Sequence, residues 1–153
     1  MANGVSIMVD RFLQNLDNVT IIDATGHILG RLASVVAKRL LNGEKIIIVN
    51  AEKAIISGKR EAVFERYKQK RDIGSHRGPF FPRMPHLIVK RTVRGMLPYK
   101  QEKGKKALKN LRVYIGVPKE LEGRKFEEIP EAKREVRYYV TLEELSRWLG
   151  AKF

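Results

Sequence analysis

The sequence predicts an α/β fold in a single domain, and three observations lead to that prediction. At 153 residues the chain is long enough for one domain that buries roughly 68–70% of its unfolded surface, but too short for two full domains. Hydrophobic residues make up 43% of the chain, which is enough for a core. Near the N-terminus an apolar run, a helical pattern and a second apolar run follow one another, which is typical of a right-handed βαβ unit with parallel strands.

The first three elements form this βαβ unit. Val19–Asp23 is a short, β-branched run followed by a turn, so we expect a buried strand there. A helix is expected from Leu29, with Gly43 as its C-terminal stop. Lys45–Asn50 is a nearly continuous apolar run and predicts the second strand. The apolar positions that recur at helical spacing are Leu32, Ala33, Val36, Leu40 and Leu41.

A short strand, a helix and a loop are predicted next. Ala54–Ile56 is expected to add a brief strand, and Ser57 to cap a helix that ends near Arg71. Gly74–Pro85 contains two glycines and three prolines in twelve residues, so an extended loop is predicted there. The expected core stripe of the helix is Val63, Phe64 and Tyr67.

The helical pattern resumes at His86 and is expected to end at Pro98. A short helix around Lys105–Asn110 and a strand at Leu111–Ile115 should follow, so the sheet gains a third or fourth member. The apolar side of the first of these helices is expected to comprise Val89, Val93, Met96 and Leu97.

The C-terminal part of the chain begins with an irregular segment and ends in a helix. Lys119–Arg137 is charge-mixed and is expected to be irregular. Thr141–Glu144 has the pattern of a capping box, and Gly150 should close the helix that this box opens. The residues expected to face inward are Leu142, Leu145, Trp148 and Leu149.

The basic charge is concentrated in one part of the chain. The formal net charge is +14 and the pI is about 10.2. Residues 59–112 hold 17 lysines and arginines against 4 acidic residues, and the rest of the chain holds 14 against 13. A charge run is usually a solvated face, but a random surface would mix both signs. Because unpaired like charges repel, the separation favours a polyanion that neutralises them, and therefore nucleic acid.

The candidate RNA-binding residues are the cations of this segment together with one histidine. Lys90, Arg91 and Arg94 stand three and four positions apart, so their side chains should project from one helix face. The lysines of residues 100–109 should follow an RNA backbone as point charges without reading its sequence. The full set is Lys59, Arg60, Arg66, Lys68, Lys70, Arg71, His76, Arg77, Arg83, Lys90, Arg91, Arg94, Lys100, Lys103, Lys105, Lys106, Lys109 and Arg112.

Arginines and aromatic rings occur together in and near the predicted loop. Arg77 and Arg83 can present a planar fork to phosphates or stack on bases. The rings of Phe80, Phe81 and Tyr99 offer faces to unstacked bases. The two phenylalanines can equally pin the loop to the core, and the sequence leaves both roles open.

The composition excludes several chemistries. No cysteine is present, so disulfides, thiolate zinc sites and cysteine nucleophiles are excluded, which fits a reducing compartment. His27, His76 and His86 lack metal-ligand spacing, so no metal is expected. The serines show no local arrangement with histidine and aspartate, and we expect no enzyme activity and no cofactor. Without a basic leader or a run of 18 apolar residues, the protein is expected to be soluble, with no membrane partner.

One turn resembles a phosphate-binding site. Thr25–Arg31 follows a strand and opens a helix, but it lacks the glycine spacing of a dinucleotide fingerprint. Ser57–Arg60 departs from a phosphate loop at both ends. Two alternatives stay open: a nucleotide-dependent RNA-modifying enzyme that uses the turn at Gly26–Arg31, and a binder of DNA or acidic membranes. Saturable nucleotide binding would identify the first, and competition among RNA, duplex DNA and anionic vesicles would identify the second.

Several short motifs along the chain resemble one known family. The most specific are Arg94–Pro98, which reads RGMLP, and Leu108–Tyr114, which reads LKNLRVY. Asp23-Ala24, Gly30–Ala33 and Val49–Lys53 support them. In these motifs the sequence resembles the universal L-thirteen family of large-ribosomal-subunit proteins.

The resemblance implies a fold, a function and a set of partners. It covers nearly all of residues 19–153, and it implies a single three-layer α/β/α domain with a four-stranded, mainly parallel sheet. Residues 1–18 lie outside it and could be a disordered N-terminal extension. Arg77–Arg83 looks like the archaeal and eukaryotic branch, and the abundance of Lys, Glu and Ile suits an archaeal thermophile.

The function implied is that of a structural, rRNA-binding constituent of the cytoplasmic large ribosomal subunit, which supports subunit assembly and translation. Its implied partners are large-subunit rRNA and neighbouring large-subunit proteins. No small-molecule substrate and no homo-oligomer are expected.

Overall fold

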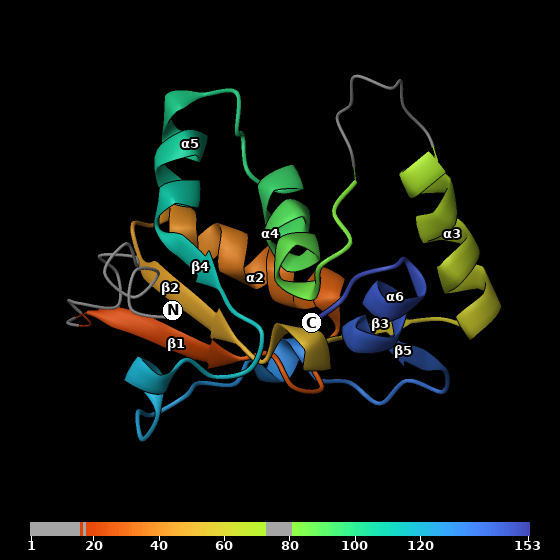
Figure 1. Cartoon of the computed structure of the whole chain (residues 1–153). Helices are drawn as coiled ribbons and strands as arrows, with labels where there is room; N and C mark the ends of the chain where they lie inside the picture. The colour runs from red at the N-terminus through yellow and green to blue at the C-terminus, as the bar shows by residue number, and fades with distance from the viewer. Residues whose placement is uncertain (1–15, 17, 73–80) are drawn as a thin grey trace.

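The computed structural model describes residue 16, residues 18–72 and residues 81–153 (Figure 1). Its central sheet has three parallel strands in the order β1 (Val19–Asp23), β2 (Lys45–Val49) and β4 (Leu111–Val113). The register pairs Ile22 with Ile48, and Ile48 with Val113. The predicted α/β class and the parallel pairing are confirmed.

The predicted four-stranded sheet is wrong, because the short run after β2 belongs to a second sheet. β3 (Ile55–Ser57) pairs antiparallel with β5 (Tyr139–Thr141). After β2 the chain turns at Asn50, whose φ of 55° is left-handed, and continues through the 3-10 turn η2 (Ala51–Lys53). This turn directs the chain away from the edge of the central sheet.

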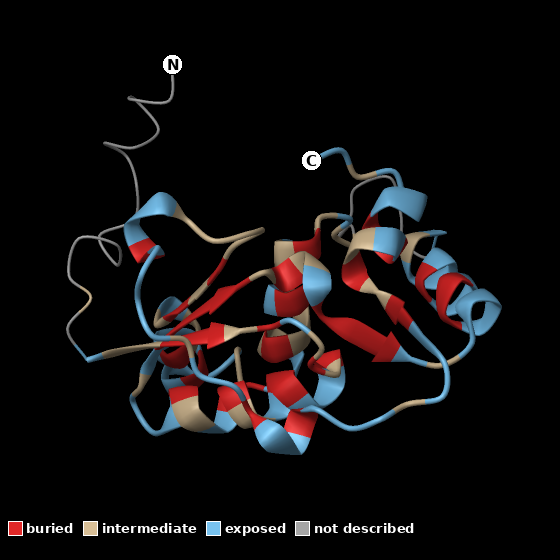
Figure 2. Cartoon of the chain, turned by 90° about the horizontal axis from the view of Figure 1, so that it is seen from below, coloured by how far each residue is buried: buried red, intermediate tan, exposed pale blue. Residues whose placement is uncertain are grey.

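Three helices cover one face of the central sheet. They are α2 (Leu29–Leu41), α4 (Pro85–Gly95) and α5 (Glu102–Lys109). Because side chains alternate along a strand, every second strand residue joins the large core beneath these helices. The strand residues on this face are Ile22, Ile46, Ile48, Leu111 and Val113. Figure 2 shows buried residues gathered along the strands and the inner helix faces, with exposed residues outside.

The other face of the sheet has a smaller core. Ile21, Ile47 and Val49 pack there with Leu121. Leu121 ends η3 (Lys119–Leu121), a 3-10 turn in the segment predicted to be irregular. Within the described ranges this layer contains no α-helix, so the implied three-layer arrangement has helices on one face only in this part of the chain.

The second sheet carries two further helices of the described residues. α3 (Arg60–Asp72) buries the predicted stripe of Val63, Phe64 and Tyr67. Ser57 does not cap it, because Ser57 lies in β3 and the helix starts only after Gly58, whose φ is 132°. α6 (Leu142–Trp148) has the predicted cap, since the Glu144 N–H donates to Thr141 Oγ1 at 3.2 Å.

Three residues predicted to face inward are exposed instead. Leu41 is the last residue of α2, and its side chain is exposed at the end of the helix. Met96 follows the end of α4, which stops at Gly95 before the predicted Pro98. Trp148 stacks on Phe64 with ring centroids 4.7 Å apart, yet its outer side remains open to solvent.

The predicted loop is described only in part. Residues 73–80 lie outside the described residues, and the helix expected at His86 already begins at Pro85, a residue suited to a first helical turn. The remaining helix predictions are close, since α5 covers Glu102–Lys109 where Lys105–Asn110 was expected. β4 ends at Val113, two residues before the predicted strand end.

Candidate nucleic-acid interface

Most of the predicted RNA-binding residues are carried by three helices that rise on one side of the molecule. In Figure 1, α3, α4 and α5 all point upward from the body. α3 carries Arg60, Arg66, Lys68, Lys70 and Arg71; α4 carries Lys90, Arg91 and Arg94; and α5 carries Lys103, Lys105, Lys106 and Lys109. The predicted residues outside these helices are Lys59, Arg83, Lys100 and Arg112, while His76, Arg77 and Phe80 lie outside the described residues.

The outward face of α4 forms a stripe of one leucine and three cations. Leu87, Lys90, Arg91 and Arg94 follow helical spacing, and the opposite side of the helix is buried. We call these four residues the α4 stripe. Their place on one face of α4 follows from the sequence, because the apolar residues on the other side of the helix fix its rotation against the core.

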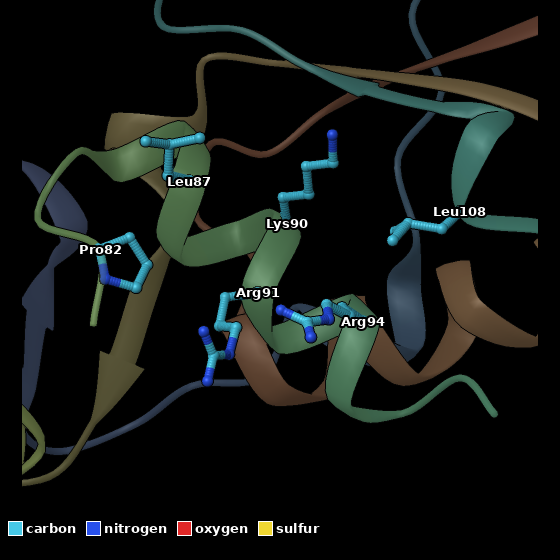
Figure 3. Close-up of a pocket in the computed structure, with 6 residues that line it drawn as sticks. All are labelled: Pro82, Leu87, Lys90, Arg91, Arg94 and Leu108. Carbon is cyan, nitrogen blue, oxygen red and sulfur yellow. The ribbon is translucent and has the colours of Figure 1, made fainter. Parts of the chain in front are cut away.

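Two open hollows flank the α4 stripe. One, of about 450 Å³, is lined by Pro82, Leu108 of α5 and the whole stripe (Figure 3). The other, of about 570 Å³, lies between Lys90 and residues of α5 and β4, and its lining includes Glu102 as well as Lys105, Lys109 and Arg112. Lys90 and Leu108 line both hollows. The sequence predicted the cations but not the hollows, since Leu87 and Leu108 come from separate helices.

The cations of the α4 stripe have no acidic partners in the described part of the chain. No carboxylate there lies within 4.0 Å of Lys90, Arg91 or Arg94. Elsewhere the molecule does pair its charges: Arg39 donates to both oxygens of Glu44 at 2.8 and 2.9 Å, and to Glu127 at 3.1 Å. The absence of partners along α4 leaves the donors of this stripe available to an anion.

Two other predicted site residues are paired with acids. Arg60 lies 2.8 Å from Glu144, and Arg71 lies 3.2 Å from Asp72. Both pairs are partly exposed, so they offer little stability and can exchange for phosphate. The sequence could not show the first pair, because its partners are 84 positions apart.

Aromatic rings hold several of the cations. Arg94 lies over the Tyr99 ring at 4.4 Å, and Lys70 lies over Tyr67 at 4.7 Å and over Phe81 at 5.5 Å. Phe81 is partly buried against the core and meets Tyr67 edge to face. Of its two possible roles, the structure therefore supports pinning of the loop. Tyr99 supports an arginine in this structure.

Cations of α3 and α4 also lie close enough to repel one another. Burial lowers the pKa of Lys70, and the nearby charges of Arg66 and Arg91 lower it further. The pKa of His86 is lowered in the same way, by burial and by Lys90. In both residues burial is the main cause, and the neighbouring cations add to it.

Gly104 determines how closely α5 approaches the turn after α4. A Cβ added to this buried glycine would overlap the Pro98 carbonyl group and lie 2.9 Å from the Tyr99 nitrogen. Only glycine allows this approach.

At the other end of the helix, Arg112 Nη1 donates to the Lys109 and Leu111 carbonyl oxygens at 2.8 Å each. These contacts fix the lysine-bearing helix against the body.

In the turn that resembled a phosphate site, the amides of Thr25–Ile28 donate to acceptors within the chain. Thr25 N–H donates to Asp23 Oδ1 at 2.9 Å, and Gly26 N–H donates to the Lys53 carbonyl at 3.1 Å. The next two amides donate to the carbonyls of Ala24 and Ala132. Burial tends to raise the pKa of Asp23, but the hydrogen bonds from Thr25 and Asn50 outweigh it and lower that pKa. The amides of Thr25–Ile28 are therefore not available to a phosphate.

His27 has a structural role in the same region. It is fully buried, its Nε2 accepts from the Ile129 N–H at 2.9 Å, and its Nδ1 lies 3.1 Å from the Thr25 carbonyl oxygen. This pair of contacts requires the neutral ring with its proton on Nδ1. The described residues hold no group of three or more histidines and acids that could bind a metal ion.

We expect the RNA-free protein to lose stability below about pH 6.5. Burial lowers the pKa of His27 in the folded protein, so the unfolded chain binds a proton more readily. The contribution of His27 to the free energy of unfolding is therefore fully present above the ordinary histidine pKa, and it falls as the pH drops below that value. The loss should approach at most about 1.4 kcal/mol per pH unit. Urea unfolding at pH 7.5, 6.5 and 5.5 measures it. His27→Gln, which keeps an acceptor without a titrating group, should flatten the dependence; an equally steep dependence in this variant would assign it to other groups, such as His86.

The sequence missed that Lys59 belongs to a cationic cluster with residues outside 59–112. Tyr138 is exposed, with Lys59 and Arg137 each 5.5 Å from its ring centroid. The neighbouring Tyr139 is also exposed. The sequence signal for this cluster is Arg137-Tyr138-Tyr139 at the end of the charge-mixed segment. Because positive and negative charges balance in that segment, the charge count did not identify it.

Fold and surface together define a small basic α/β protein with its cations concentrated on α3, α4 and α5. A search for membrane-spanning helices in the described ranges finds none of sufficient length and hydrophobicity. Residues 17–120 match the model of the family described as Ribosomal protein L13. The chain belongs to the ribosomal protein L13 family.

Several similar curated proteins are archaeal and carry the name large ribosomal subunit protein uL13. That of Archaeoglobus fulgidus is 57% identical over 152 residues, which cover 95% of this chain and 97% of the relative. That of Methanococcoides burtonii is 50% identical over 139 residues, which cover 88% of this chain and all of the relative. The predicted family and its archaeal branch are confirmed.

Proposed function

We propose that this protein is a structural constituent of the large ribosomal subunit and that it binds large-subunit rRNA through residues 59–112. The observation that carries the proposal is the α4 stripe, three cations on one helix face without acidic partners in the described part of the chain. The names of the archaeal relatives support the assignment to the large subunit. The site of action is then the cytoplasm.

The mechanism is structural rather than catalytic. The cores on both faces of the sheet hold the body rigid, and the cations of α3, α4 and α5 neutralise phosphates of RNA segments that meet there. Arginine and lysine contacts of this kind recognise RNA mainly by the shape of its backbone. Holding such segments together supports assembly of the subunit, and no cofactor takes part.

The domain limits and the partners follow from the same proposal. Residues 19–153 act as one RNA-binding domain, and residues 1–18 are an extension from it. Neighbouring large-subunit proteins contact the surface that rRNA leaves free. The used amides of the turn at Thr25–Ile28 speak against the nucleotide-dependent alternative.

Sedimentation of cell extract through a gradient at high salt tests this function. The protein, followed by mass spectrometry, should stay in the large-subunit peak at about one copy per particle, because many charge contacts act at once. Recovery among free proteins, while large subunits stay intact, would contradict the proposal. Competition with duplex DNA and with anionic vesicles, at matched charge, should displace little of the protein from rRNA.

A further inference from the structure

The hollow between α4 and α5 contains more apolar surface than phosphate binding needs. Its volume of about 450 Å³ lies within the range of ligand pockets. Leu87 is 42% exposed on a helix face that otherwise carries cations, and it lines this hollow with Pro82 and Leu108. A surface that only follows a phosphate backbone gains nothing from exposed leucine.

The rim of the hollow is cationic. Lys90, Arg91 and Arg94 line it, and Figure 3 shows their side chains leaving α4 in different directions around the space between Pro82 and Leu108. Arg94 is held over the Tyr99 ring at 4.4 Å, which limits the motion of its planar guanidinium group. A ligand of this hollow therefore presents a flat apolar group together with negative charge close beside it.

We propose that this hollow receives a single unstacked nucleobase of large-subunit rRNA. The base covers Leu87 and Leu108, and Lys90, Arg91 and Arg94 bind the phosphates on either side of that nucleotide. This inference rests on the proposed function and adds a position-specific contact to it. RNA is the ligand favoured by the charge, because an apolar peptide segment would leave three cations without partners, whereas each nucleotide brings a base and a phosphate together.

The chain offers a variant that separates base binding from charge. Leu87→Ala removes apolar surface and no charge, so it should lower affinity for large-subunit rRNA by roughly fivefold to tenfold, the lower part of the range for one base contact. The slope of log affinity against log salt should not change, because no phosphate contact is lost. Leu41→Ala is the matched control, since Leu41 is 45% exposed at the end of α2, outside the hollow.

Photocrosslinking within assembled large subunits gives the direct test. With 4-thiouridine or 6-thioguanosine in the rRNA, the reactive atom is on the base, so a crosslink to the tryptic peptide Met84–Lys90 places a base at the hollow. Crosslinks confined to other peptides, together with equal affinities of Leu87→Ala and Leu41→Ala, would overturn the inference. In a second experiment with photo-leucine at position 87, a crosslink to a neighbouring protein instead of rRNA would overturn it as well. In both cases retention in the large-subunit peak would leave the proposed function standing, whereas loss from that peak would remove both.

Discussion

Replacing Gly104 with alanine should destabilise the protein by about 2–3 kcal/mol, the largest effect that we expect from adding a single methyl group. The new Cβ would overlap the Pro98 carbonyl oxygen, and backbone cannot move aside as a flexible side chain can. α5 must therefore shift away from the turn at Pro98–Tyr99. Urea unfolding of the purified protein measures the loss.

A matched glycine tests the explanation. Gly30 lies in α2, where an added Cβ would have nothing within 4 Å, so Gly30→Ala should stabilise the protein by about 0.5–1 kcal/mol through helix propensity. If Gly104→Ala proved as stable as the wild type, α5 would not be packed as closely as described. Since α5 carries four of the predicted lysines, Gly104→Ala should also weaken rRNA binding at constant salt.

Neutralising the α4 stripe should produce the largest loss of RNA affinity. In the triple variant Lys90→Gln, Arg91→Gln, Arg94→Gln, the slope of log affinity against log salt should become shallower by about 2–3, at 0.7–0.9 for each lost phosphate contact. Stability without RNA should stay the same or rise, because these cations have no acidic partners in the described part of the chain and Arg91 lies close to Lys70.

The control for this variant removes the same charge elsewhere. Lys38, Lys119 and Lys125 are exposed and lie outside residues 59–112, so their triple replacement by glutamine should leave most of the slope intact. Salt titrations of binding to large-subunit rRNA measure both variants. Equal slopes in the two variants would mean that net charge alone, rather than the α4 stripe, determines affinity.

The sequence predicted elements well wherever one long apolar pattern defined them. α2 starts and ends where its spacing and Gly43 indicated, and β1 has the predicted bounds. The sequence could not predict which sheet β3 joins. Its apolar run is equally compatible with pairing to a nearby strand of the central sheet and with pairing to Tyr139–Thr141. The left-handed turn at Asn50 decides this, and asparagine adopts that conformation only in some contexts.

The candidate site was predicted as a composition but not as a geometry. The charge count identified residues 59–112, and helical spacing placed Lys90, Arg91 and Arg94 together. Pairings between distant residues could not be read from the sequence, among them Arg60 with Glu144 and Lys70 with Phe81. The hollow was missed for the same reason, since its apolar lining combines Leu87 of α4 with Leu108 of α5.

The cations of the α4 stripe, which have no acidic partners among the described residues, affect what happens to protein made in excess of rRNA. A ligand that binds only the folded chain stabilises it by mass action. Here the ligand is rRNA, whose phosphates would also reduce the repulsion of Lys70 by Arg66 and Arg91. Copies without RNA are therefore the less stable population, and proteases act on chains that open. With the proposed function, we expect this charge separation to shorten the lifetime of surplus copies and to help keep protein and rRNA in proportion.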